Sequence, residues 1–398
     1  MEIYTKKLLQ TSKQNVVVDD MFLTIDIPTT AGSKMLDEYK SLFECEVITR
    51  LKNNNYTLGG KVSVGEFAID LVGETFYKGT LEKDGKLLNA CTEALKQDDV
   101  LAGISFDVNG AIRRACAQNN LICIKPTYGI VSRYGTISVA CSGETISVVA
   151  KKSDDCKKVL DAISGHDDRD GTSLPEELCN QAKNSLAKVK KIALLKSMTK
   201  NINKDIQLKI DSFCKILSNN NVEIVEIDDS VINLSKTAWN ALMCAELCNN
   251  VSRYDGVKYG YRANNFTNID ELYTNSRTES FGDLVKAAIL YGSEVLSSDN
   301  YMKVYDKSLR LRRLIVEEFT KIFSSFDAVI LPACSSLNYT TEQVNKDKFM
   351  AFEENFYTAP ASITGLPAII VGGVQIVGNK FSENTLFEIA KMYEKEGK

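Results

Sequence analysis

The sequence is poor in the residues that build metal sites and disulfide frameworks. His166 is the only histidine, and none of the eleven cysteines stands in a CxxC pair. These shortages exclude a zinc site of the usual spacing, and we expect neither a metal ion nor a cofactor. Scattered cysteines of this kind are typical of buried, reduced thiols.

Long apolar runs are missing as well. The N-terminal stretch MEIYTKKLLQTSKQN is polar and lacks the apolar centre of a signal peptide. No later stretch reaches the roughly 18 consecutive apolar residues that a membrane-spanning helix needs. We therefore expect a cytosolic protein that does not associate with membranes.

Proline and excess basic charge are also scarce. With only 6 prolines and no linker rich in proline or serine, residues 1–398 are expected to form one domain.

Lysine and arginine number 48 against 52 acidic residues, which gives a formal net charge of −4. No global basic field draws the chain to nucleic acid, so we expect no direct contact with nucleic acid.

The apolar residues alternate between the period of strands and the period of helices. A strand is predicted at residues 192–195, then a helix whose apolar face carries Ile206, Ile210, Phe213 and Leu217, then a strand at 222–227. Such an order is typical of βαβ units, in which the helix packs on the sheet that holds both strands.

The same order returns near the end of the chain. The sequence SLRLRRLIVEEFTKIF (Ser308–Phe323) predicts an amphipathic helix, and Ala328–Pro332 predicts a buried strand. Together these patterns predict an α/β fold with a central mixed sheet and helices on both faces. Residues 200–290 are richest in helix signals, and we expect them to form a helix-rich lobe on the sheet.

Several segments resemble one enzyme family closely. KPTYGIVSRYGTISVACS (Lys125–Ser142) is similar to the segment after the nucleophile in amidase signature enzymes, and SGHDDRDGTS (Ser164–Ser173) looks like a loop of the same family. AELCNNVSRYDGVKYGYR (Ala245–Arg262) resembles a stretch that separates the A subunit of aspartyl/glutamyl-tRNA amidotransferases from ordinary amidases. The likeness extends over most of the chain, which starts roughly sixty residues later than the family subunit usually does.

This resemblance implies a single amidase signature domain and a place in a multisubunit enzyme. The family subunit hydrolyses glutamine and passes the ammonia to a B subunit. The B subunit then amidates an ATP-activated acyl group on tRNA, while a small C subunit braces the pair.

The three residues with which the family cleaves amides are different in this sequence. By resemblance, the nucleophilic serine of the GGSIR turn corresponds to Ala111 in NGAIR (Asn109–Arg113). The bridging serine of the GGSSGGS loop corresponds to Leu87 in GKLLNAC (Gly85–Cys91), and the base lysine of IKDN corresponds to Asp19. A methyl group cannot form an acyl-enzyme, leucine cannot relay a proton, and a carboxylate cannot replace a neutral lysine as the base.

Other family positions are kept. Asp107, Gly110 and Arg113 match residues beside the nucleophile, and we expect them to hold the turn as structure. Arg312 matches approximately the arginine that receives the α-carboxylate of glutamine, and a guanidinium suits that bidentate contact. An arginine on the surface of an amphipathic helix is the alternative.

Three hypotheses follow. The first is a non-catalytic relative of the family's A subunit that acts by binding, as a structural or regulatory partner of B and C subunits or of an active A subunit. The second is an active amidase or amidotransferase component with a rebuilt site that uses Cys91 or the pair Asp19–Asp20. The third is a sensor of amino acids or amides, in which Arg312 grips a carboxylate.

Overall fold

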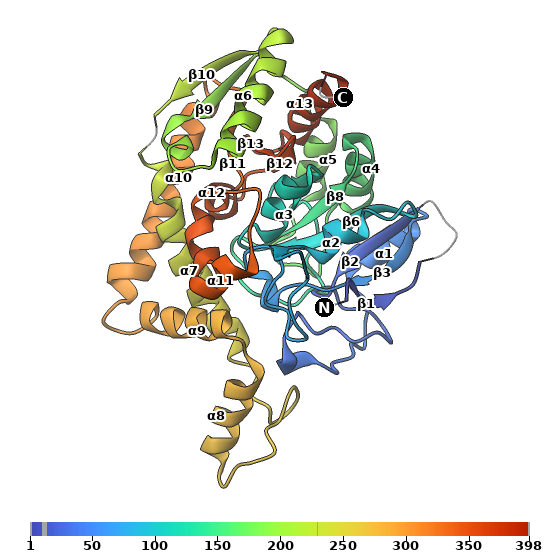
Figure 1. Cartoon of the computed structure of the whole chain (residues 1–398), viewed down its shortest axis with the longest axis vertical. Helices are drawn as coiled ribbons and strands as arrows, with labels where there is room; N and C mark the ends of the chain where they lie inside the picture. The colour runs from blue at the N-terminus through green and yellow to red at the C-terminus, as the bar shows by residue number, and fades with distance from the viewer. Residues whose placement is uncertain (1, 10–13, 229, 397–398) are drawn as a thin grey trace.

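The computed structural model describes residues 2–9, 14–228 and 230–396 of the chain. Its framework is one large mixed sheet that runs through the whole molecule (Figure 1). Within the described residues, the 11 strands of this sheet lie in the spatial order β1 (Tyr4–Lys7), β3 (Thr57–Val62), β2 (Asn15–Asp19), β6 (Val100–Asp107), β8 (Thr145–Ala150), β7 (Ile122–Lys125), β12 (Ala368–Val371), β13 (Val374–Gly378), β11 (Ala328–Pro332), β9 (Lys191–Leu195) and β10 (Glu223–Ile227).

The sheet contains both parallel and antiparallel pairs. β2 runs parallel to β3 and β6, and β9 runs parallel to β10 and β11. Between these two parallel parts, β8, β7, β12 and β13 pair antiparallel with their neighbours. The mixed sheet predicted from the sequence is therefore confirmed. A separate small hairpin is formed by β4 (Glu82–Lys83) and β5 (Lys86–Leu87).

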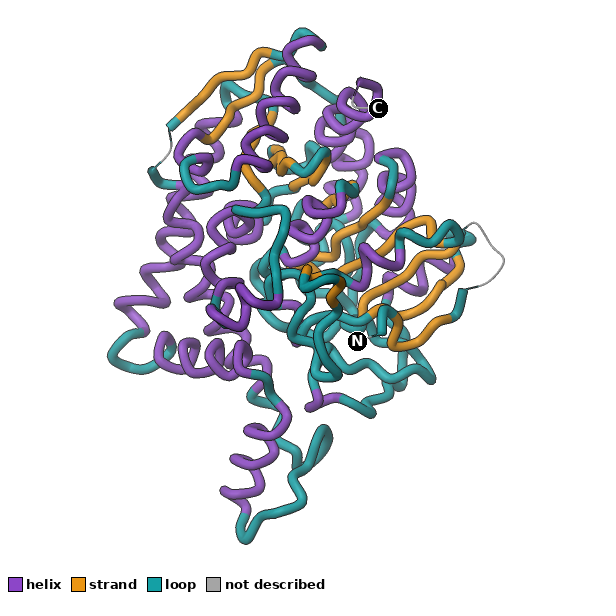
Figure 2. Tube along the Cα trace, viewed as in Figure 1, coloured by secondary structure: helices purple, strands orange, loops and turns teal. Residues whose placement is uncertain are grey.

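Helices cover both faces of the sheet (Figure 2). One group, joined by contacts among its members, consists of α1 (Glu46–Asn53), α4 (Ser153–Ile163), α5 (Glu176–Asn184), α13 (Glu383–Glu396) and α6 (Lys204–Asn219). The other face carries α2 (Ala90–Ala94), α3 (Ala111–Asn119), α12 (Met350–Thr364), α7 (Ser235–Val251) and α10 (Asp306–Phe323). The remaining helices are α8 (Ile269–Ser280), α9 (Asp283–Val295) and α11 (Thr341–Lys346).

The apolar pattern explains why these elements form. Every residue of β2, β8, β11, β12 and β13 is buried, because helices cover both sides of these central strands. In α6 the side chains of Ile206, Ile210, Phe213 and Leu217 are fully buried, at the spacing of one helix face. The predicted strands and helices at β9, α6, β10, α10 and β11 are confirmed, with ends that differ by at most two residues.

The periphery is more varied. Between residues 200 and 290 the structure places α6, β10, α7, α8 and the start of α9, and β10 forms an edge of the main sheet. The loop before α8 and α8 itself extend away from the body, at the bottom of Figure 1. Residues 1 and 10–13 of the polar N-terminal stretch lie outside the described residues. No helix in the described part of the chain has the length and apolar character to cross a membrane.

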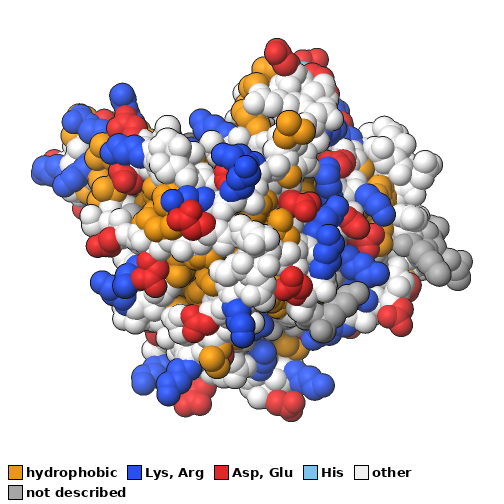
Figure 3. Space-filling model, turned by 90° about the horizontal axis from the view of Figure 1, so that it is seen from above, with side chains coloured by type: hydrophobic (Ala, Val, Ile, Leu, Met, Phe, Trp, Pro, Cys, Tyr) orange, Lys and Arg blue, Asp and Glu red, His pale blue; other side chains and the backbone are white. Residues whose placement is uncertain are grey.

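The surface carries mixed charge. On the face seen in Figure 3, basic and acidic side chains are interspersed, with hydrophobic side chains showing between them. This mixture agrees with the near balance of 48 basic and 52 acidic residues in the sequence.

Candidate functional site

The turn that holds Ala111 joins the end of β6 to the start of α3. Gly110 precedes the helix with φ 88°, a left-handed conformation in which a Cβ atom would lie 2.4 Å from the Cβ of Thr358. Glycine is therefore required at this position. Ala111, the first residue of α3, is 8% exposed, and its backbone N–H donates to the side-chain oxygen of Asn109 at 3.2 Å. The position offers neither a nucleophile nor a free N–H.

A neighbouring loop is fastened onto this turn. The Asn109 side-chain amide donates to the carbonyls of Ile69 (2.7 Å) and Asp70 (2.9 Å). Arg114, which is fully buried, donates to the carbonyls of Leu71 (2.7 Å) and Asp70 (2.9 Å). Burial and the adjacent Glu74 raise the pKa of the Asp70 carboxyl well above its usual value. The loop 69–71 is thus held against the turn by four hydrogen bonds.

Arg114 and Asp70 lie beside the turn at Ala111, although no pattern in the sequence indicated them. Arg114 also donates to the carbonyl of Asn109 at 3.0 Å and to the hydroxyl of Thr358 at 3.1 Å. An arginine on a short helix carries no sequence signal of burial, because the oxygens that satisfy it come from distant segments.

Asp107 and Arg113 form a buried ion pair across the same turn. The guanidinium contacts both carboxylate oxygens, at 2.8 Å and 3.1 Å, and neither side chain is exposed. It also donates to Gln375, to Ser362 and to the carbonyl of Thr358. Burial alone would raise the pKa of Asp107, but the attraction of Arg113 outweighs it and leaves that pKa below its usual value. The pair anchors α3 to α12 and β13.

Asp19 lies at the end of β2, beside the end of β6. One carboxylate oxygen accepts from the Ser105 hydroxyl (2.9 Å) and the Phe106 N–H (2.7 Å), and the other accepts from the Met21 N–H (3.1 Å). Burial raises the pKa of Asp19 to about 6. Both oxygens are therefore occupied by structural donors of the fold.

A buried lysine stands next to Asp19 on the neighbouring strand β3. The ammonium group of Lys61 lies 2.8 Å from the Asp20 carboxylate and donates to Thr29 (2.6 Å) and to the Pro28 carbonyl (2.9 Å). Burial lowers the pKa of Lys61. An ammonium has three donors, and these three contacts use them all. Lys61, which the sequence patterns also did not indicate, is a structural cation of this corner.

Leu87 lies in the small β4–β5 hairpin. Its N–H donates to the Tyr339 carbonyl at 2.9 Å, and its side chain is 1% exposed. Together with Glu66, Glu74 and other residues it lines a pocket of about 360 Å³. Its side chain supplies an apolar wall there and has no atom that can carry a proton.

The thiols and the histidine lie in different surroundings. Cys91 and Cys116 are buried, and burial raises the pKa of each thiol well above its usual value. A thiol with a raised pKa is a poor nucleophile because little thiolate forms.

His166 lies in an exposed loop, with Nε2 2.9 Å from Asp168. Within the described residues, no group of three or more acidic, histidine or cysteine side chains is placed to hold a metal ion.

Arg312 extends from α10 toward the segment before β8. Its guanidinium donates to the Ser142 carbonyl at 2.8 Å, and the Ser142 N–H donates to Glu246 at 2.8 Å. Burial lowers the pKa of Arg312, while the nearby Glu246 opposes this effect. The guanidinium thus binds a carbonyl of the chain itself.

A family model described as Amidase matches residues 97–387. The chain belongs to the amidase family. The A subunit of glutamyl-tRNA(Gln) amidotransferase from Clostridium novyi (strain NT) is 33% identical over 402 residues, which cover 96% of this chain and 81% of that relative. The protein of the same name from Streptococcus pneumoniae serotype 19F (strain G54) is 30% identical, over 95% of this chain and 82% of the relative.

Solved structures of amidase-family proteins share the fold. The A subunit of glutamyl-tRNA(Gln) amidotransferase from Thermotoga maritima superposes with a TM-score of 0.80 at 22% identity, covering 100% of this chain and 87% of the other. The urea amidolyase of K. lactis superposes with a TM-score of 0.81 at 21% identity, covering 97% of this chain and 23% of that longer protein. The α/β architecture expected from the sequence is thus that of the amidase family.

Proposed function

We propose that this amidase-family chain does not cleave amides and acts as a structural or regulatory binding subunit. The observation that carries the proposal is the turn at Ala111. An acyl-transfer site needs a nucleophile and free N–H donors for the oxyanion. Here the side chain is a methyl group and its N–H is bound by Asn109.

The two other positions support the same proposal. Leu87 cannot relay a proton, and the oxygens of Asp19 are held by three donors of the fold. Removing the nucleophile of an acyl-transfer site leaves at best the small rate that binding and polarisation supply. Loop 69–71 is also tied to the turn by hydrogen bonds from Asn109 and Arg114.

The proposed partners are other components of an amidotransferase. The relatives from Clostridium novyi and Streptococcus pneumoniae are A subunits of such an enzyme, and the likeness covers most of the present chain. We propose that the chain binds B-type and C-type subunits, or an active A subunit, through the scaffold it shares with these relatives.

Ammonia release from glutamine and asparagine tests the catalytic half of the proposal. The chain is assayed alone and with the B-type and C-type subunits of its organism. The expected result is no release above a heat-denatured control, and turnover by the wild-type chain would overturn the proposal. The variant Ala111→Ser with Leu87→Ser and Asp19→Lys shows whether residue identity alone is limiting.

Because Asn109 and Arg114 hold loop 69–71 against the turn, we expect that triple variant to stay inactive as well. Adding Arg114→Gln and Asn109→Gly removes these hydrogen bonds, and thermal denaturation checks that each variant is folded. Size-exclusion chromatography with the candidate subunits tests the binding half. Co-elution at a fixed ratio is expected, and separate elution from all of them would refute the proposed partnership.

A further inference from the structure

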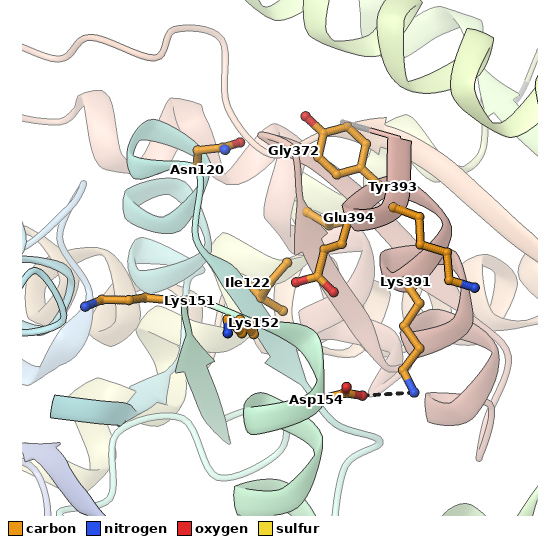
Figure 4. Close-up of a pocket in the computed structure, with 11 residues that line it drawn as sticks. Asn120, Ile122, Lys151, Lys152, Asp154, Gly372, Lys391, Tyr393 and Glu394 are labelled. Atoms are coloured by element: carbon orange, nitrogen blue, oxygen red, sulfur yellow. Dashed lines mark ion pairs between the residues drawn. The ribbon is translucent and has the colours of Figure 1, made fainter. Parts of the chain in front are cut away.

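A second pocket lies at the opposite end of α3 from Ala111 (Figure 4). Its volume is about 730 Å³, and Asn120, which follows the last residue of α3, stands in its wall. A helix of 9 residues is about 13 Å long, so this pocket is separate from the turn at Ala111. Small-molecule sites commonly have volumes of about 300–1,000 Å³.

Lysine dominates the lining of this pocket. Lys151 and Lys152 come from the segment between β8 and α4, and Lys391 and Lys395 come from α13. Figure 4 shows Lys152 and Lys391 around the same hollow, whereas the side chain of Lys151 points away from it to the left. The whole chain has a net charge of −4, so this gathering of positive charge is a local feature.

The two carboxylates of the pocket are already engaged. Asp154 pairs with Lys391 at 2.9 Å, the contact that is dashed in Figure 4. Glu394 accepts from the N–H of Ser153 at 2.9 Å and from the Ser153 hydroxyl, at the start of α4. Ser153 is 1% exposed, so this contact fixes Glu394 to the helix N-terminus, where a negative charge is favourable.

The remaining charge is positive. Within the described residues, Lys152 and Lys395 have no ion pair, whereas Lys151 donates to the Gln97 carbonyl at 3.3 Å and lies 4.0 Å from the exposed Asp98. One wall is apolar, because Tyr393 stacks on Phe213 with ring centroids 5.3 Å apart and faces the same pocket as Ile122 and Val371.

We propose that this pocket binds the phosphate group of a small molecule, with the apolar wall beside Tyr393 taking the organic part. Lysine ammonium groups bind phosphate as point charges, and the pocket lining offers two unpaired ones from two segments, Lys152 before α4 and Lys395 in α13. The site does not depend on residue 111, and the proposal does not depend on the chain lacking amidase activity.

Isothermal titration calorimetry of the full chain tests this site at constant ionic strength. Inorganic pyrophosphate and ADP are the probes. We expect saturable binding at one site that weakens with added salt, because screening reduces the attraction between exposed charges. Tighter binding of ADP than of pyrophosphate is expected, because the apolar wall takes the organic part, and equal binding would overturn that part of the proposal.

Two matched variants decide whether the pocket is responsible. Lys152→Gln with Lys395→Gln is expected to weaken binding about tenfold or more, since each unpaired ammonium supplies a charge-assisted contact. Lys258→Gln with Lys303→Gln removes two exposed lysines from other parts of the chain and is expected to leave binding unchanged. Equal weakening in the two variants, or no heat with either probe, would overturn the proposal.

Discussion

The variant Asp19→Asn tests the raised pKa of the buried Asp19 carboxyl, which by resemblance occupies the position of the family's base. Burial raises the pKa of Asp19 from its ordinary 3.8 to about 6. This difference corresponds to about 3 kcal/mol in favour of the neutral carboxyl in the folded protein. The folded chain therefore holds the Asp19 proton more tightly than the unfolded chain does.

The direction of the pH effect follows from this difference. The stability that the neutral carboxyl contributes is fully present below pH 3.8 and is lost as the pH rises through about 6. Between pH 4 and pH 7.5 the wild-type chain should lose about 2.5 kcal/mol of unfolding free energy through Asp19. Asparagine cannot ionise, so the variant lacks this loss. In the variant, an amide nitrogen replaces one of the two oxygens that accept from the N–H groups of Met21 and Phe106. The resulting loss of stability does not change with pH.

The assay is urea denaturation followed by circular dichroism at several pH values from 4 to 7.5. The free energy of unfolding of Asp19→Asn minus that of the wild type should increase by about 2.5 kcal/mol over this range. Asp98→Asn, at a fully exposed carboxyl, is the matched control. A difference for Asp19→Asn that stays flat over the range would refute the reasoning.

Further outcomes are expected around the same turn. Arg113→Ala leaves its buried carboxylate partner unpaired and should lower the free energy of unfolding by about 3–5 kcal/mol in urea titrations; a loss below about 1 kcal/mol would contradict the assignment. Gly110→Ala forces a Cβ against Thr358 at positive φ and should cost about 2–4 kcal/mol, measured as a lower thermal midpoint, whereas an unchanged midpoint would argue against that geometry. Iodoacetamide at pH 7.5 should leave Cys91 and Cys116 unlabelled in the native protein and label them in denaturant, as read by mass spectrometry; native labelling would show that these thiols are accessible.

Local sequence patterns are sufficient for the main elements of the fold. Apolar runs such as Ala328–Pro332 form central strands because both of their faces are covered, and the helical spacing of Ile206 to Leu217 forms the buried face of α6. The order of strands in the sheet depends on pairings between distant segments. β12, for example, pairs with β7 from a distant part of the chain, and no local pattern encodes that pairing.

Only part of the candidate site can be predicted from the sequence. Spacing locates Ala111 and its neighbours, because a turn between a strand and a helix is continuous in the chain. Arg114 and Lys61 give no such signal, because a charged side chain becomes buried only where carbonyls and carboxylates from other segments surround it. For Arg312 the sequence leaves a ligand contact and a surface position open, and the structure adds the Ser142 carbonyl as a third kind of partner.

The side chain of Asn109 makes the present form of the turn self-supporting. It binds the N–H of Ala111 and two carbonyls of loop 69–71, and each such bond is worth about 1 kcal/mol. Replacing Asn109 by the glycine of the resembling GGSIR turn would lose all three bonds at once. A change toward the family turn would therefore have to replace the contacts of Asn109 as well as the methyl group of Ala111.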